Sequence, residues 1–141
     1  YEDLLTIPAV CLNAKRIECI PDKLYYYNRQ NENSITAQKT VKKLYDLFQG
    51  RMKNRHLAVA RKVDCLEALD KIMVKETMKC LFRQYAYNEL SVPQEQEICD
   101  YLKERLDKSE VVGLRNKFWV KMLLAKRKKL CVWYAHFRGY M

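Results

Sequence analysis

Glycine and proline are scarce in this chain, and each occurs three times in 141 residues. Both residues interrupt regular secondary structure, and folds rich in turns need many of them. Leu, Lys, Arg, Glu and Met, which favour helices, are abundant. Hydrophobic residues make up 49% of the chain and aromatic residues 11%, which excludes a disordered tail. The sequence therefore predicts a folded, mainly α domain with long helices.

The first 36 residues differ from the rest, because they predict one helix followed by two short strands. We expect the helix at about 3–14, where apolar residues supply a buried side and Glu2 and Asp3 suit the helix dipole. Pro8 fits this helix only in its first turn or at a kink. Residues 16–20 and 24–27 indicate strands around a turn at Pro21, since β-branched and aromatic residues partly alternate there.

After residue 36, apolar residues recur at intervals of three and four, which is the period of a helix. Thr36 is expected to cap the first helix of this region, and Gly50 to weaken or break it. Capping patterns begin two more helices, and the last part of the chain has helical character without a clean amphipathic pattern. The expected ranges are 64–88, a helix that follows Ser91, a break at 109–113 and a final helix at 114–137.

The net charge of +10 is concentrated at the C-terminal end. Residues 1–36 carry four basic and five acidic side chains, and residues 37–112 carry fifteen and twelve. Residues 113–141 carry eight basic side chains and no acid. This segment has no ion-pair partner of its own, so we expect it to face a polyanion, an anionic membrane surface or acidic side chains elsewhere in the chain.

The six cysteines include no Cys-x-x-Cys pair, and most lie among apolar residues. A disulfide framework and a zinc cluster both fit this spacing poorly, so we expect reduced, mostly buried thiols in a cytoplasmic protein. The sequence has no signal peptide and no apolar run of about 18 residues, the length that a membrane-spanning helix needs.

Two motifs in the first 36 residues occur in a characteristic order. The chain begins Tyr-Glu-Asp-Leu-Leu, and residues 24–27 read Leu-Tyr-Tyr-Tyr, followed by Ser-Ile-Thr at 34–36. This order resembles the closing segment of the catalytic domain of family 2 glycosyltransferases, which have a GT-A fold and use nucleotide sugars. The resemblance implies that residues 1–36 end a GT-A domain. Residues 37–141 would then form an α-helical C-terminal region whose basic terminal helix is 113–141.

The resemblance also implies roles for three side chains. Asp3 corresponds to the general base that takes a proton from the acceptor hydroxyl, a task that suits an ionised carboxylate. Glu2 would support it or orient the acceptor, and Arg29 would contact the leaving diphosphate. The Mn²⁺ or Mg²⁺ ion and the nucleotide sugar would be held by residues outside this chain, so the chain alone is expected to be inactive. The acceptor would be a glycan or a lipid-linked sugar.

The basic run at 126–129 is open to three interpretations. It can be a solvated helix face, a contact with an anionic membrane surface at the cytoplasmic side, or a nucleic-acid site. We disfavour nucleic acid because no recognised binding module accompanies the charge. A rival to the enzyme hypothesis is a helical module that binds an acidic partner or a membrane through residues 113–141. Its contact residues would be Lys126, Arg127, Lys128, Lys129, Trp119 and Trp133.

Overall fold

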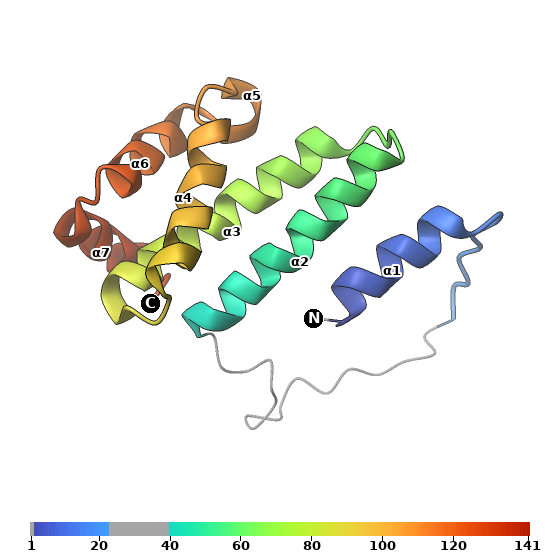
Figure 1. Ribbon diagram of the computed structural model, residues 1–141, viewed down its shortest axis with the longest axis horizontal. Helices are drawn as coiled ribbons and strands as arrows, with labels where there is room; N and C mark the ends of the chain where they lie inside the picture. The colour runs from blue at the N-terminus through green and yellow to red at the C-terminus, as the bar shows by residue number, and fades with distance from the viewer. Residues whose placement is uncertain (1, 23–39) are drawn as a thin grey trace.

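The computed structural model describes residues 2–22 and 40–141, without the side chains of Glu2, Ser109 and Glu110. Neither range contains a β-strand, and most of their residues are helical, which confirms the mainly α class (Figure 1). The helices are α1 (Glu2–Asn13), α2 (Val41–Ala60), α3 (Leu66–Tyr87), α4 (Val92–Arg105), α5 (Ser109–Val112), α6 (Leu114–Leu124) and α7 (Lys128–Phe137).

Helix α3 lies at the centre of the fold and contacts α2, α4, α5, α6 and α7. In Figure 1, α2 and α3 lie side by side, and α1 lies along the outer side of α2. The predicted boundary at residue 36 therefore separates two parts that pack against each other. Buried hydrophobic residues of α3 lie three or four positions apart, as from Val74 to Met78 and from Met78 to Leu81 and Phe82, which gives this helix its core face.

Aromatic rings fix the C-terminal helices to α3. The ring of Phe82 lies within 6.2 Å of those of Trp119, Tyr134 and Tyr140, measured between centroids. The Tyr85 hydroxyl, also on α3, donates to the carbonyl oxygen of Leu123 at 2.6 Å. Because such large rings bury much apolar area, these contacts hold α6 and α7 against the centre of the fold.

The helix starts agree only in part with the sequence predictions. Thr40, not Thr36, caps α2, and its Oγ1 accepts from the backbone N–H of Lys43 at 3.2 Å. The start expected around residue 64 is confirmed, but Cys65 is the N-cap and makes no side-chain bond. Ser91 begins α4 as predicted, with a capping box in which its N–H donates to Gln94 Oε1 at 3.0 Å.

The single helix expected at 114–137 is wrong, because the chain turns between α6 and α7. Lys126 has a φ of 52°, in the left-handed region, and interrupts the helix. One straight helix over this range would be about 36 Å long, and much of it would leave the core. The turn instead lets both halves contact α3. As a result, the basic run 126–129 lies at a corner and on the first turn of α7.

The strand expected at 16–20 is also wrong, since these residues have no regular secondary structure. A strand needs a hydrogen-bonding partner, and the described ranges contain none. The strand expected at 24–27 lies outside the described residues. All six cysteines are free thiols, but only Cys80, Cys99 and Cys131 are buried. Burial raises the pKa of the Cys80 thiol to about 12, so this sulfur stays protonated and unreactive at neutral pH.

Candidate functional site

The first turn of α1 carries Glu2 and Asp3. The Asp3 side chain is exposed to solvent rather than buried against α2. A carboxylate at this end of a helix is favoured by the helix dipole. The structure thus places the Asp3 carboxylate at the surface, open to solvent.

Pro8 lies in the middle of α1 and outside its first turn. Proline has no N–H, so the carbonyl oxygen of Leu4, four residues earlier, lacks its usual helical donor. Asn54 of α2 supplies the missing donor, since its Nδ2 lies 2.6 Å from that oxygen. Pro8 is therefore tolerated in the helix interior because a neighbouring helix satisfies the freed carbonyl group.

Gly50 allows α1 to approach α2 closely at the same point. A Cβ atom on Gly50 would lie 2.8 Å from Cδ2 of Leu4, and α2 continues through this glycine without the predicted break. At the other end of α1, Arg61 donates to Oδ1 of Asn13 at 3.0 Å. The position of the Asp3 turn is thus fixed by α2, a helix that belongs to the C-terminal region.

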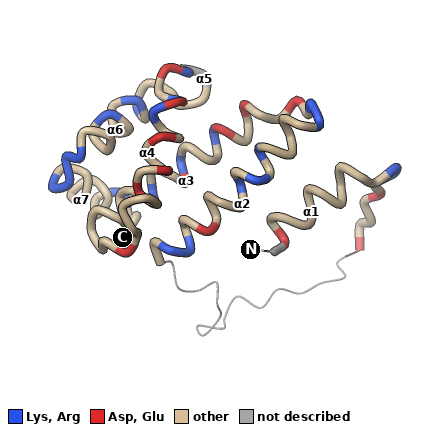
Figure 2. The backbone as a smooth tube through the Cα atoms, viewed as in Figure 1, with Lys and Arg blue, Asp and Glu red and all other residues tan. Residues whose placement is uncertain are grey.

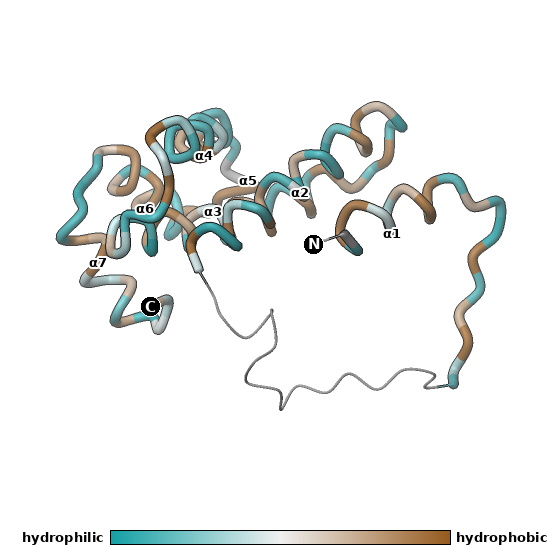
Figure 3. Tube along the Cα trace, turned by 60° about the horizontal axis from the view of Figure 1, so that its bottom comes forward, coloured by the Kyte–Doolittle hydropathy of each residue, from teal (hydrophilic) through white to brown (hydrophobic). Residues whose placement is uncertain are grey.

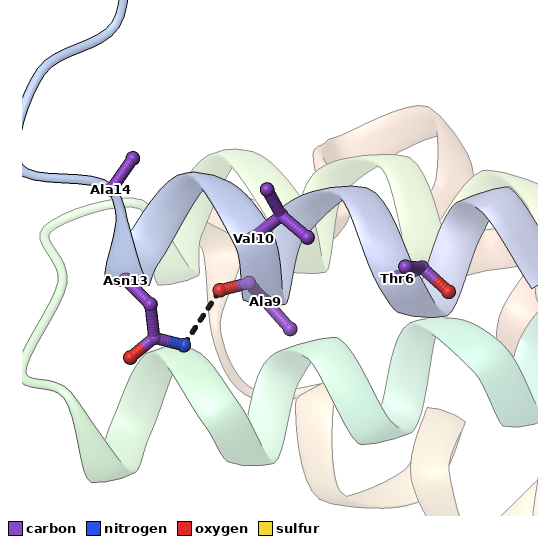
Figure 4. A pocket seen from close by; sticks show the side chains of 5 residues that line it. All are labelled: Thr6, Ala9, Val10, Asn13 and Ala14. Atoms are coloured by element: carbon purple, nitrogen blue, oxygen red, sulfur yellow. Dashed lines mark hydrogen bonds between the residues drawn. The ribbon is translucent and has the colours of Figure 1, made fainter.

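The side of α1 away from α2 exposes apolar residues. Ile7 is 58% exposed and Val10 is 60% exposed. Figure 4 shows Val10 beside a shallow pocket, pointing away from α2, whereas Asn13 points toward α2. Figure 3 shows that hydrophobic positions continue beyond α1, where Ile17 and Ile20 are also exposed. Exposed apolar residues in this number on one segment are typical of a surface that another protein part covers.

Several predicted site residues cannot be placed. Arg29, the tyrosines at 25–27 and the Ser-Ile-Thr segment at 34–36 lie outside the described residues. The part of the chain that is described contains no group of three or more His, Cys, Asp or Glu side chains that could hold a metal ion. It also contains no helix with the length and apolar character needed to cross a bilayer.

All four residues of the basic run at the α6–α7 corner are exposed, but two of their side chains have partners. Nζ of Lys126 lies 3.6 Å from Oε1 of Glu95 on α4, and Lys128 lies over the ring of Tyr85. Figure 2 shows that α6, α7 and their connection carry Lys and Arg without any Asp or Glu. Lys126 therefore has an acidic partner elsewhere in the chain, which was one of the expectations for this segment. Arg127 and Lys129 are exposed to solvent.

The two tryptophans of the predicted contact surface have different environments. Trp119 is half-buried and stacks on Tyr134 with a centroid distance of 3.6 Å. Trp133 is 63% exposed and stacks on Phe137, which is 76% exposed. Trp133 and Phe137 are thus the exposed aromatic residues of α7.

A buried charged cluster joins α2, α3 and α4. Asp70 is 4% exposed and accepts hydrogen bonds from Arg55 Nε at 2.8 Å and from the Tyr101 hydroxyl at 3.1 Å. Arg105, which is 1% exposed, approaches the same carboxylate at 3.4 Å. Burial by itself raises the pKa of Asp70, but the Arg55 hydrogen bond and the charges of both arginines outweigh it and lower the pKa. The cluster holds three helices together.

The chain matches no protein-family model, no curated protein and no solved structure. Sequence reasoning missed Asn54, the residue that fixes the Asp3 turn. The internal Pro8 was a signal that some donor must reach the Leu4 carbonyl. Only the packing of α1 on α2 identifies that donor.

Proposed function

We propose that this chain is the C-terminal part of a family 2 glycosyltransferase of bacterial type, with Asp3 as its general base. The observation that supports this most is the exposed Asp3 in the first turn of a helix that α2 holds in place. A base must be positioned but accessible, and this geometry meets both conditions. Glu2, in the same turn, would orient the acceptor.

The exposed apolar side of α1 fits the same proposal. In the complete enzyme, we propose that the preceding part of the GT-A domain covers Ile7 and Val10, as well as Ile17 and Ile20. Apolar residues in water gain about 25 cal/mol for each Å² that becomes buried, so such a contact would stabilise both parts. The C-terminal helices would then brace the catalytic helix from its other side.

The proposed reaction is a single displacement. The acceptor hydroxyl oxygen forms a bond to the anomeric carbon, the bond from that carbon to the diphosphate breaks, and the hydroxyl proton passes to Asp3. A divalent ion, Mn²⁺ or Mg²⁺, would stabilise the leaving diphosphate and be held by residues that precede this chain. Arg29 would assist by contacting the phosphate oxygens.

The isolated chain, residues 1–141, is expected neither to transfer sugar nor to bind nucleotide sugars measurably. The phosphate-binding loop and the metal carboxylates of such enzymes would lie upstream. Calorimetry with uridine and guanosine diphosphate sugars in the presence of Mn²⁺ measures this, with the upstream-extended protein as the positive control. Tight binding by the isolated chain would contradict the placement of the donor site, and an extended protein without β-α units and Asp-x-Asp would contradict the enzyme proposal.

A second proposal concerns α7, which would place the protein against an anionic membrane surface on the cytoplasmic side. The specific observation in its favour is the exposed pair Trp133 and Phe137 on a helix whose first turn carries Lys128 and Lys129 and no acid. Positive side chains at this end of a helix oppose its dipole, and an anionic headgroup would relieve that repulsion. Exposed aromatic rings beside basic side chains suit the lipid interface.

Replacing Lys126, Arg127, Lys128 and Lys129 by alanine is expected to weaken binding to phosphatidylglycerol vesicles by about 100-fold or more at low salt. Each basic side chain near such a surface contributes on the order of 1 kcal/mol, and each 1.4 kcal/mol is about tenfold. Co-sedimentation measures the binding. A control in which alanine replaces the exposed Lys53, Lys71, Lys103 and Lys108 loses the same charge and should still bind.

Binding of the wild type should fall as salt rises, since the contact is screened over about 10 Å at 0.1 M salt. Phosphatidylcholine vesicles should bind little protein. Equal binding of the two alanine variants, or no binding of the wild type to phosphatidylglycerol at low salt, would favour a solvated face. The acidic-partner alternative would then remain for this surface.

A further inference from the structure

A small cavity lies between α3, α6 and the end of α7, away from the basic corner at 126–129. Its volume is about 30 Å³. The buried Met78 and the half-buried Tyr134 belong to its lining, and Tyr134 is held by its stacking on Trp119. The other lining residues are polar or basic: Lys75, Arg115, Asn116, Arg138 and Tyr140.

Three positive side chains line this cavity, and they come from three separate elements. Lys75 comes from α3, Arg115 from α6 and Arg138 from the C-cap of α7. None of the three forms an ion pair with a carboxylate whose position is described. Glu76, the neighbour of Lys75, instead pairs with Arg51 at 2.5 Å. Like charges brought together without an acid repel each other unless an anion joins them.

The neutral groups of the cavity can also donate hydrogen bonds to an anion. Asn116 offers its side-chain amide, and Tyr140 offers its hydroxyl group. Arg115 and Asn116 lie in the first turn of α6, which has no side-chain cap and no acid. The partial positive charge of that helix end therefore adds to the three cations.

We propose that this cavity binds a single phosphate group, either as a free ion or as a phosphomonoester. A guanidinium and an ammonium group together match the several oxygens of a tetrahedral dianion. A cavity of about 30 Å³ is far smaller than the pockets of about 300–1,000 Å³ that enclose drug-sized ligands, so a nucleoside does not fit. The site is independent of both the proposed sugar transfer and the proposed membrane contact of residues 126–129.

The test is a titration of the ¹⁵N-labelled chain with inorganic phosphate, followed by NMR at constant ionic strength. We expect saturable shifts of the Arg115 and Asn116 amide signals. Arg115→Gln or Lys75→Gln should weaken the affinity by about tenfold, because each removes a charge-assisted bond. Both side chains are exposed, so the variants should fold. Lys121→Gln removes the same charge from α6 outside the cavity and should leave the affinity unchanged.

A second titration with soluble dihexanoyl phosphatidic acid distinguishes the two sources of the group. Equal affinity for both probes indicates a free phosphate, and tighter binding of the lipid indicates a headgroup. Either result supports the site if Arg115→Gln weakens the binding of the probe and the alanine variant of 126–129 does not. Absence of saturation with both probes, or an equal loss in Lys121→Gln, would overturn the proposal.

Discussion

Asp3→Asn in the complete enzyme that we propose is expected to lower sugar transfer by about 100-fold to 10,000-fold, which is the usual loss when a general base is removed. Asparagine keeps the size of the side chain but cannot accept the proton from the acceptor hydroxyl. Folding and donor binding should change little, because Asp3 is exposed. Initial rates of transfer, together with calorimetric binding of the nucleotide sugar, measure both effects.

Asp22→Asn is the matched control, since it makes the same chemical change at an exposed acid to which we assign no role. Its rate should equal that of the wild type. Asn54→Leu provides a second comparison, because it removes the donor to the Leu4 carbonyl without touching a substrate. An intermediate loss is expected there, as the turn that carries Asp3 becomes less firmly held. Near wild-type turnover by Asp3→Asn would show that Asp3 is not the base.

The sequence was sufficient to predict helices but not how the chain turns between them. The helical period and the capping box at Ser91 are local signals, and the structure confirms the helices that they predicted. Thr36 and Thr40 are equivalent as helix caps in the sequence, but the structure uses Thr40. A tertiary contact favours this start, because the N–H of Val41, the next residue, donates to Glu89 at 2.9 Å. The turn at Lys126 has no glycine or proline, so no local signal predicts it.

The candidate sites show the same division. Asp3 was predicted from a resemblance at the start of the chain, and the structure adds that its helix is exposed on one side. Asn54 and the cavity of Lys75, Arg115 and Arg138 were not predicted. Asn54 is 50 residues from Leu4 in the sequence, and Lys75 is 40 residues from Arg115. Only tertiary packing brings these residues together. Trp119 and Trp133 are alike in sequence context, yet only Trp133 is exposed.

Asp70→Asn is expected to destabilise the isolated chain by about 3–5 kcal/mol, the usual result when one partner of a buried ion pair is removed. The Arg105 guanidinium, 1% exposed, would lose its buried partner and keep only the exposed Glu104, whose Oε2 lies 2.6 Å from its Nη1, and the Arg55 bond would weaken. This is a large part of the roughly 5–15 kcal/mol that stabilises a typical domain. Urea denaturation followed by circular dichroism measures the free energy of unfolding.

Asp100→Asn, on the exposed side of α4, is the matched control and should change stability by less than about 0.5 kcal/mol. Adding Arg105→Met to Asp70→Asn should recover part of the loss, because it removes the buried cation that has lost its buried partner. The pH dependence gives a further check. The folded state lowers the pKa of Asp70, so its contribution is present above the ordinary carboxyl pKa of about 3.9 and is lost as pH falls through the lower folded value. Asp70→Asn should therefore lose less stability than the wild type in acid, and identical acid dependence in the two proteins would contradict this role for the cluster.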